Sequence, residues 1–420
     1  MITKNKARSD KKLWTDAGDG MPVQIVSVPN ERVEGETIVR RVKMGTDMGL
    51  RRFRDYAILY RTNAQSRSIE ESLLHYGIPY HIVGGQRFYD RKEIKDMLAY
   101  IRLVYQPTDR VSFERIVNVP ARGVGATSLA KFYAWQFSNH LTLYEALTTV
   151  ETCDELTAKA RKGLSEVGDI ITSFHEHVAT MTVSALIEAL IRRVEYFSYL
   201  NDGTPQGEAR QENVRELMSV AAEYQELGLE GFLEEVALMS DIDNVDRGGN
   251  AVTLMTLHAA KGLEFPVVFM IGLEETVLPH SRALYDMTEM EEERRLCYVG
   301  MTRAREELHM LYASSRLLYG GQQHNPPSRF LAEIGGESAL QGSALSKQPD
   351  LAGWGQQAQD NAYIDDAPHY VPELNEGDKV RHQVFGVGQV LELDGDTATI
   401  FFKGKGAKKL NISFAPLERL

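Results

Sequence analysis

The sequence predicts an α/β fold in which a parallel sheet is interrupted by a long helical insertion and followed by a small β module. Three observations predict it. Short apolar runs bounded by polar loops occur on both sides of residues 88 to 245. Within that stretch apolar side chains recur at helical spacing, and strand signals are nearly absent. Residues 375 to 420 contain short alternating strands broken by glycine-rich turns.

The first half of the sheet is predicted between residues 23 and 83. Val23–Val28 is one expected strand, in an otherwise polar and glycine-containing segment. A clearer unit follows, with a strand at Tyr56–Tyr60, a helix at Ser66–His75 and a strand at Pro79–Val83. A strand–helix–strand unit is the connection that neighbouring parallel strands require.

The inserted segment begins near Phe88. Helices are expected at Ser128–Phe137, Ser184–Tyr199 and Ala209–Glu226 among other amphipathic stretches. At Ala251 the strand pattern resumes. Three independent domains in series would leave residues 1 to 87 with about three strands and an open edge, so we favour one α/β domain interrupted by an insertion.

The second half of the sheet carries the polar residues of interest. Strands are expected at Val252–Leu257 and Val267–Ile271, followed by a charged helix at Glu289–Met301 and a third strand. The predicted domains are therefore 1–87 and 246–335 for the α/β domain, 88–245 for the insertion, 336–374 for a flexible linker and 375–420 for a β-barrel.

Composition narrows the class of protein. The 420 residues carry a formal net charge of −12, which argues against a protein that coats nucleic acid over its whole surface but allows a local basic groove. Two isolated cysteines, Cys153 and Cys297, argue against a disulfide framework or a cysteine metal site, and no metal site is predicted. No apolar run approaches the roughly 20 residues of a membrane span, and a cytoplasmic location is expected.

The loop His258–Phe265 and Arg303 suit nucleotide or phosphate chemistry. Ligands of open α/β sheets bind at the carboxyl ends of strands, where we expect this loop and the arginine-bearing turn. Glu264 could accept hydrogen bonds from a ribose, and His258 could donate to a phosphate, although an ordinary polar loop is an equal alternative. A guanidinium beside a γ-phosphate accelerates transfer by roughly 10³–10⁵ in other nucleotide hydrolases. A surface ion pair is the alternative for Arg303.

Two segments of this half, TLHAAKGLEFPVVF and EEERRLCYVGMTRAREEL, closely resemble motifs V and VI of superfamily 1 DNA helicases of the PcrA/UvrD/Rep type. YRTNAQSRSIEE and FYDRKEIKDMLAY resemble the family's segment in the first half of the same motor domain and the entry to its helical insertion. The resemblance covers essentially the whole chain. It implies a RecA-like domain (2A) split by a mostly helical inserted domain (2B), and a Tudor-like or SH3-like tail.

The resemblance also implies roles for single residues. Arg303 matches the arginine finger that faces the γ-phosphate of ATP, and Glu264 matches a nucleotide contact. Four further residues match single-strand DNA contacts, with Tyr319 stacking on a base: Arg61, Asn63, His258 and Tyr319. Without the resemblance, Tyr319 would be interpreted as a core or loop tyrosine.

Two further segments match binding elements of the family. The turn between Pro120 and Thr127 resembles the duplex-binding turn of domain 2B, and its glycines let N–H groups approach a phosphate at a helix N-terminus. Its candidate contacts are Arg122, Gly123, Val124, Gly125 and Thr127. A tight turn without ligand is the alternative. The tail resembles a module that engages RNA polymerase, with a basic edge formed by Lys403, Lys405, Lys408 and Lys409. Lysines on a β-edge also protect against aggregation.

A phosphate-binding loop of the form Gly-x-x-x-x-Gly-Lys-Ser/Thr is absent from the sequence, as is an apolar strand ending in Asp-Glu. ATP with Mg²⁺ would therefore be bound mainly by a first motor domain that this chain lacks. We predict the C-terminal part of an ATP-dependent 3′–5′ DNA helicase of repair and replication, acting on single-stranded and junction DNA and inactive alone. The alternative is a non-catalytic adaptor that binds DNA and RNA polymerase.

Overall fold

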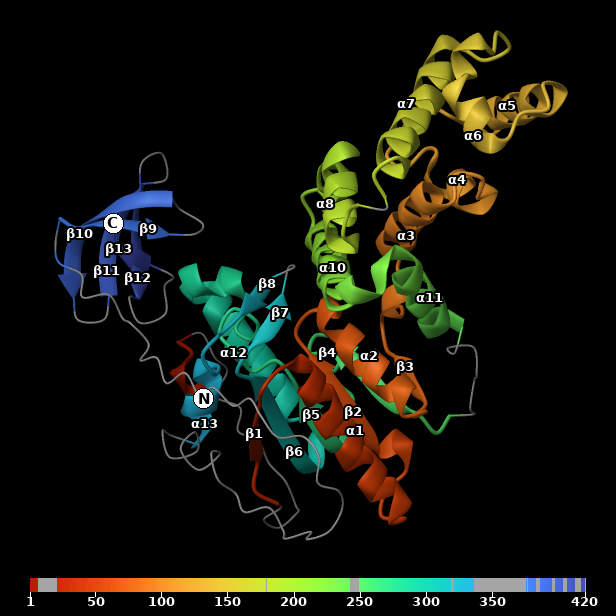
Figure 1. Cartoon of the computed structure of the whole chain (residues 1–420). Coiled ribbons are helices and arrows are strands. Elements are labelled where there is room, and N and C mark those ends of the chain that lie inside the picture. The colour runs from red at the N-terminus through yellow and green to blue at the C-terminus, as the bar shows by residue number, and fades with distance from the viewer. Residues whose placement is uncertain are drawn as a thin grey trace. The chain divides into compact units, whose positions relative to one another are not determined.

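The computed structural model describes residues 1–6, 21–178, 180–241, 249–318, 321–335, 375, 377–382, 386–394, 397–402, 406–411 and 417–419 (Figure 1). The chain divides into two compact units, Met1–Ser281 with Met290–Leu345, and Arg282–Glu289 with Ser346–Leu420. No helix of the described residues is long and apolar enough to cross a membrane. Both Cys153 and Cys297 are buried free thiols.

A six-stranded parallel sheet is the centre of the first unit, and its order is β1-β6-β5-β2-β4-β3. Three strands precede the insertion and three follow it: β1 (Gln24–Val28), β2 (Tyr56–Tyr60), β3 (Tyr80–Ile82), β4 (Val252–Thr256), β5 (Phe265–Met270) and β6 (Ala304–Ala313). Strands from the two halves are intermixed across the sheet. The predicted α/β domain interrupted by an insertion is confirmed, because neither half could form this sheet alone.

Helix α1 (Glu31–Asp47) was not predicted. It begins at Asn30, whose side chain accepts a hydrogen bond from the Val33 amide at 3.0 Å, and it buries Ile38, Val39 and Val42 against the sheet. Gly35 lies so close to α2 (Ser66–His75) that an added Cβ would be 2.3 Å from Ser72 Oγ. The two helices therefore pack side by side, and the glycine that allows this weakens the helical pattern in the sequence.

All secondary-structure elements among the described residues of the inserted segment are helices, and the segment has its own apolar core, which extends in sequence from Phe88 to Val236. Its helices are α3 (Lys92–Tyr105), α4 (Arg110–Ile116), α5 (Ala126–Ser138), α6 (Leu143–Thr148), α7 (Ala158–His175), α8 (Val183–Arg193), α9 (Tyr196–Leu200), α10 (Pro205–Glu223) and α11 (Gly228–Asp241). The single helix expected at Ser184–Tyr199 is two helices, because Glu195 has a φ of +50° and interrupts the helical hydrogen bonds.

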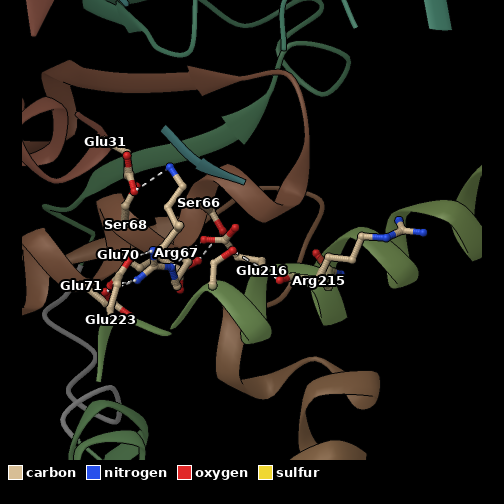
Figure 2. A network of polar contacts seen from close by, with 12 residues as sticks. Glu31, Ser66, Arg67, Ser68, Glu70, Glu71, Arg215, Glu216 and Glu223 are labelled. Carbon is tan, nitrogen blue, oxygen red and sulfur yellow. Dashed lines mark hydrogen bonds and ion pairs between the residues drawn. The ribbon is translucent and has the colours of Figure 1, made fainter. Parts of the chain in front are cut away.

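Helix α10 of the insertion contacts both the sheet domain and the other helices of the insertion. Arg67 on α2 is 2% exposed and contacts Glu216 at 2.7 Å and Glu223 at 2.8 Å on α10, together with Glu71 at 2.9 Å on its own helix. Figure 2 shows this guanidinium among the carboxylates of the two helices. Other residues of α10, among them Val214, Leu217 and Val220, are buried in the insertion's core. The domain limit drawn at residue 245 stays a prediction.

The remaining elements of the first unit are the hairpin of β7 (Arg316–Leu318) and β8 (Gly321–Gln323), and α13 (Arg329–Gly335). Helix α12 (Met287–Met301) precedes β6.

The tail is a five-stranded antiparallel sheet of order β12-β11-β10-β9-β13, as the predicted β module requires. Its strands are β9 (Lys379–His382), β10 (Gly386–Asp394), β11 (Thr397–Phe402), β12 (Gly406–Asn411) and β13 (Leu417–Arg419). Phe402 and Ile400 are fully buried in its small core. A Cβ at Gly388 would be 2.6 Å from the Phe402 ring, so this glycine makes room for the largest side chain of the core.

Candidate functional site

The candidate residues of the sheet lie at two opposite edges. Arg61 and His258 follow β2 and β4, at the carboxyl edge, whereas Glu264 and Arg303 precede β5 and β6, at the amino edge. Because β4 and β5 are both parallel to β2, the loop between β4 and β5 runs from the carboxyl edge of the sheet back to the amino edge. The expectation that all these residues lie at the carboxyl ends of strands is therefore wrong for Glu264 and Arg303.

Arg303 is held by neutral oxygen atoms. Its guanidinium donates from Nε to the Val299 carbonyl, from Nη1 to the Leu263 carbonyl and from Nη2 to Thr302 Oγ1, each at 3.0 Å. Val299 lies in the last turn of α12, where carbonyl groups concentrate partial negative charge. No carboxylate of the described residues forms an ion pair with Arg303. The side chain is positioned, but its charge is not neutralised.

Glu264 lies beside Arg303. The Phe265 amide donates to the Arg303 carbonyl at 2.9 Å, where the β5–β6 ladder begins. Glu264 itself is exposed. Helix α12 packs tightly against the start of the loop, because a Cβ at Gly300 would be 2.5 Å from Leu257 Cδ2. We call Glu264 and Arg303 the nucleotide wall.

The carboxyl edge holds a different arginine environment. Arg61 donates to both oxygens of Glu293, with distances of 2.7 to 3.0 Å, and the two side chains are 17% and 6% exposed. Glu293 also accepts a hydrogen bond from the His280 amide at 2.9 Å. The charge of Arg61 is thus compensated by a nearly buried carboxylate. We call Arg61, Asn63 and His258 the strand-facing group, because the resemblance implies that they face single-stranded DNA.

Gln65 shapes the turn that carries Arg61 and Asn63. Its Oε1 accepts hydrogen bonds from the amides of Arg61 and Thr62, both at 2.9 Å. Gln65 and Glu293 were missed by sequence reasoning. The signal for Gln65 was its place three residues after Thr62, which is the spacing of a capping box; Glu293 lies 232 residues from Arg61 in the chain, and no local pattern predicts that pair.

His258 is exposed over part of its surface. Partial burial of the imidazole lowers its pKa below the ordinary value of 6.5, and the positive charge of Arg61 lowers it further, while Glu293 and Glu292 oppose the shift. The ring is therefore mostly neutral at pH 7. A neutral imidazole can donate one hydrogen bond to a phosphate oxygen.

The turn expected to bind duplex DNA is folded around Asn118. Asn118 Oδ1 accepts hydrogen bonds from the amides of Arg122 at 2.7 Å and Gly123 at 3.0 Å. The buried Arg122 guanidinium contacts Glu166 at 3.0 Å and the Tyr100 hydroxyl at 2.8 Å, and Val124 is 2% exposed. The side chains of Arg122 and Val124 thus point into the core, so their expected contact with duplex DNA, which stays a prediction, would be made through the backbone.

Gly123, Gly125 and Thr127 are the exposed candidates of this turn. Gly123 has a φ of +75°, in the left-handed region that glycine favours, and Gly125 is the N-terminal cap of α5. A duplex contact here would involve these three residues.

Tyr319, Lys403 and Lys405 lie outside the described residues. Lys408 and Lys409 belong to β12 of the tail. The hairpin strands β7 and β8 flank Tyr319 in sequence, and Arg316 holds β7 to the sheet domain.

Arg316, the first residue of β7, is clamped by two buried carboxylates. It contacts Glu274 and Glu34, each at 2.8 Å, and all three side chains are 4% exposed or less. Glu34 Oε1 also accepts from the Gly272 amide at 3.1 Å. Burial raises the pKa of Glu34 to about 7, with Arg316 opposing the shift and Glu274 adding to it. The start of the hairpin is thereby fixed to α1 and to the loop after β5.

Comparison with known proteins identifies the family. The model of the UvrD-like helicase C-terminal domain matches residues 1–315, and that of the PcrA/UvrD tudor domain matches residues 377–419. The chain belongs to the UvrD-like helicase family. The resemblance seen in the motifs is confirmed, and the two matches correspond to the mixed α/β unit and the small antiparallel tail.

Relatives of the chain include longer bacterial proteins. The ATP-dependent DNA helicase PcrA of Bacillus subtilis (strain 168) is 40% identical, and those of Staphylococcus aureus (strain NCTC 8325 / PS 47) and Leuconostoc citreum are each 37% identical. Each alignment covers all of this chain but only 59–60% of the relative. The chain corresponds to the C-terminal portion of these proteins. Its described residues contain no group of three or more His, Cys, Asp or Glu that could hold a metal ion.

Proposed function

We propose that this chain forms the C-terminal portion of an ATP-dependent 3′–5′ DNA helicase. In this role it supplies one wall of the ATP site and part of the track for single-stranded DNA. The observation that carries the proposal is the loop between β4 and β5, which begins at His258 and ends at Glu264 beside Arg303. One continuous loop thus joins the strand-facing group to the nucleotide wall. The names of the relatives, ATP-dependent DNA helicases, support the same assignment.

The nucleotide wall fits one side of bound ATP. The Arg303 guanidinium has no carboxylate partner among the described residues, so its charge is available to stabilise the charge that develops on a transferred phosphoryl group. Glu264 is exposed beside it and can accept hydrogen bonds from a ribose. Mg²⁺ and most of the phosphate contacts would come from a first motor domain. The chain therefore contributes one catalytic arginine and depends on a partner domain for hydrolysis.

Arg303 also connects the nucleotide wall to the loop between β4 and β5 and to α12. Its guanidinium donates to the Leu263 carbonyl, near the end of the loop, and to the Val299 carbonyl in α12. A phosphate that attracts Arg303 competes with these two carbonyl groups and so shifts the loop end relative to the helix. The other end of the loop carries His258 in the strand-facing group. The state of the nucleotide is thereby communicated to the bound DNA strand.

The strand-facing group would contact the phosphodiester backbone, with Tyr319 stacking on a base. Stacking contributes roughly 1–3 kcal/mol per base and is insensitive to sequence, which suits a translocating motor. In the insertion, Gly123, Gly125 and Thr127 would contact the duplex, and the tail would bind RNA polymerase. Repair and replication of DNA are the processes proposed for the complete protein.

The proposal is tested by separating binding from hydrolysis. The chain alone is expected to bind labelled single-stranded oligonucleotide but to hydrolyse no ATP. Fusion to the N-terminal portion of the Bacillus subtilis relative, which this chain does not cover, should restore ATP hydrolysis stimulated by single-stranded DNA. Stimulated hydrolysis by the chain alone would contradict the proposal.

The same experiment distinguishes the adaptor. A fusion that binds nucleotide and DNA but never hydrolyses ATP would favour a non-catalytic protein that binds DNA and RNA polymerase. The single-strand track is tested within the chain alone by Tyr319→Ala, which should weaken binding of the oligonucleotide by about 1–3 kcal/mol. Tyr76→Ala, at a tyrosine that is 45% exposed directly after α2, is the matched control.

A further inference from the structure

A small surface with two cationic side chains, Arg87 and Lys95, lies next to the strand-facing group. A pocket of about 420 Å³ opens beside the edge strand β3, where the chain leaves the sheet through the short helix Phe88–Asp90 and enters α3. The residues of its lining that could contact a ligand are His81, Gly85, Gln86, Arg87, Asp90 and Lys95. None of them has a role in the function proposed above.

The loop that borders this pocket also borders the strand-facing group. A Cβ at Gly85 would be 4.0 Å from Asn63 Oδ1, and a Cβ at Gly84 would be 3.8 Å from the Cβ of Ala259, the neighbour of His258. The two glycines carry no side chain that would separate the pocket from Asn63 and His258. A strand bound by those two residues can therefore continue into the pocket over exposed backbone. The glycines alone do not indicate a ligand, because Gly84 has a φ of +72° and is required by the turn itself.

The charges in the pocket suit a phosphate. Arg87 and Lys95 are cationic, and Asp90 is the only carboxylate in the lining. Lys95 pairs with Asp90 at 2.6 Å, but the two side chains are 45% and 49% exposed. Exposed pairs contribute only about 0–1 kcal/mol, so a phosphate can displace Asp90 at small cost. The Arg87 guanidinium lies 5.4 Å from the centre of the Tyr80 ring, a cation–π contact that orients it.

The pocket and the Asn63 turn are joined by buried hydrogen bonds. Arg91, at the start of α3, donates to Ser66 Oγ at 2.7 Å, and the Ser66 hydroxyl lies within hydrogen-bond distance of the Asn63 carbonyl, at 2.9 Å, and of Glu70 Oε1, at 2.5 Å. Arg91 also donates to Asn213 on α10 at 2.8 Å. Arg91, Ser66 and Asn213 are all buried. The Asn63 turn is thus fixed to the start of α3 before any ligand binds, and Lys95 lies one helical turn further along, where its amide donates to the Arg91 carbonyl at 2.9 Å. This arrangement lowers the entropy lost when one strand contacts both.

We propose that this pocket binds a phosphodiester group of single-stranded nucleic acid and extends the track from Asn63 and His258 to the entry of the insertion. The inference rests on the proposed function, because it requires a strand at the carboxyl edge of the sheet. Contacts to phosphate carry no sequence information, so the pocket adds affinity without adding base preference. It also makes α3, the first helix of the insertion, part of the strand-binding surface.

The test uses two variants of the complete chain with opposite expected effects. Lys95→Gln should weaken binding of a labelled oligothymidine about three- to tenfold and reduce the slope of log affinity against log salt concentration by about 0.7, the value for one phosphate on a single strand. Asp90→Asn should strengthen binding, because it releases Lys95 and removes a repulsive charge. Lys92→Gln, at another exposed lysine of α3 that does not line this pocket, should leave both quantities unchanged.

The outcomes separate this inference from the function on which it rests. Tighter binding by Asp90→Asn cannot result from unfolding, so the two opposite shifts together support the site. If the unaltered chain binds the oligonucleotide and both variants match it in affinity and salt slope, the pocket is not on the track, and the proposed function stands. If the unaltered chain binds no single-stranded DNA, both are overturned.

Discussion

The arginines at the two edges of the sheet have different partners. In the nucleotide wall, Arg303 is held by two carbonyl groups and a hydroxyl. At the carboxyl edge, Arg61 is paired with Glu293, and Arg316 is enclosed by Glu34 and Glu274. Neutral acceptors fix an orientation and leave the charge available. A buried carboxylate fixes an orientation and cancels the charge.

This difference indicates what each arginine can do. Desolvated charge pairs are costly to break, so Arg316 serves to hold the hairpin in place, and Arg61 would contact a phosphate while it remains paired with Glu293. Arg303 can exchange its carbonyl partners for a phosphate at far lower cost. The variants described below test that contrast, beginning with the largest expected effect.

Arg303→Ala should abolish the catalytic contribution of the chain. In the fusion with the N-terminal portion of the Bacillus subtilis relative, we expect ATP hydrolysis stimulated by DNA to fall about 10³-fold or more, with affinity for single-stranded DNA nearly unchanged. Steady-state hydrolysis and fluorescence anisotropy measure the two quantities. Arg305→Ala, at an exposed residue two positions later, is the control. Unchanged turnover in Arg303→Ala would mean that the nucleotide wall is not catalytic.

Glu34→Gln should change how stability depends on pH. Burial raises the pKa of Glu34 from 4.5 to about 7, so its contribution to stability is complete below about pH 4.5 and is lost as pH rises through about 7. Relative to the variant, the unaltered chain should therefore lose on the order of 3 kcal/mol of unfolding free energy between pH 4.5 and pH 8. Urea unfolding at several pH values measures this, with Glu36→Gln on the same helix as control. Parallel pH profiles would show that Arg316 keeps Glu34 ionised throughout.

Glu293→Gln should distinguish the stabilising effect of the Arg61–Glu293 pair from the attraction of Arg61 for DNA. Loss of the carboxylate leaves the guanidinium of Arg61 without its partner and should lower the unfolding free energy by about 2 kcal/mol. The same change frees the charge of Arg61, so binding of single-stranded DNA should become tighter. Glu292→Gln, one residue earlier on α12 and 60% exposed at its side chain, should change neither quantity. Weaker binding by Glu293→Gln would mean that the paired geometry, rather than the charge, is what the strand requires.

His258 should have the smallest effect. Since burial and Arg61 lower its pKa, affinity for single-stranded DNA should be nearly constant between pH 7 and pH 8 and should rise only below the ordinary pKa of 6.5, where an imidazolium attracts phosphate. In His258→Gln this rise should disappear. A rise that begins between pH 8 and pH 7 and depends on His258 would contradict the lowered pKa.

Much of the fold could be predicted because its signals are local. The strands at Tyr56–Tyr60 and Val252–Thr256 and the helix at Ser66–His75 follow from apolar runs and spacing. Helix α1 was missed because Gly35 and many charged residues obscure its pattern, although Gly35 is required by the contact with Ser72. The insertion was predicted from the open edge that independent domains would leave, and the strand order, which intermixes strands from the two halves, confirms it.

The candidate residues could be named from the sequence, but their surroundings could not. Residue types and the resemblance pointed to Arg303, Glu264, Arg61 and His258. The burial of Arg122 had no signal in the sequence, because a glycine-flanked arginine before a helix is equally compatible with an exposed turn. Its partners Tyr100 and Glu166 lie 22 and 44 residues away.

The sequence by itself therefore determined the family, the elements and the identity of the chemical groups, since these depend on spacing within a few turns of chain. Only the tertiary structure decided which edge of the sheet each group occupies and whether its charge is free. Those properties depend on the strand order β1-β6-β5-β2-β4-β3 and on pairs such as Arg61 with Glu293, which are 232 residues apart. A charge is neutralised by whatever the fold places within about 4 Å of it, and no local pattern specifies that neighbour.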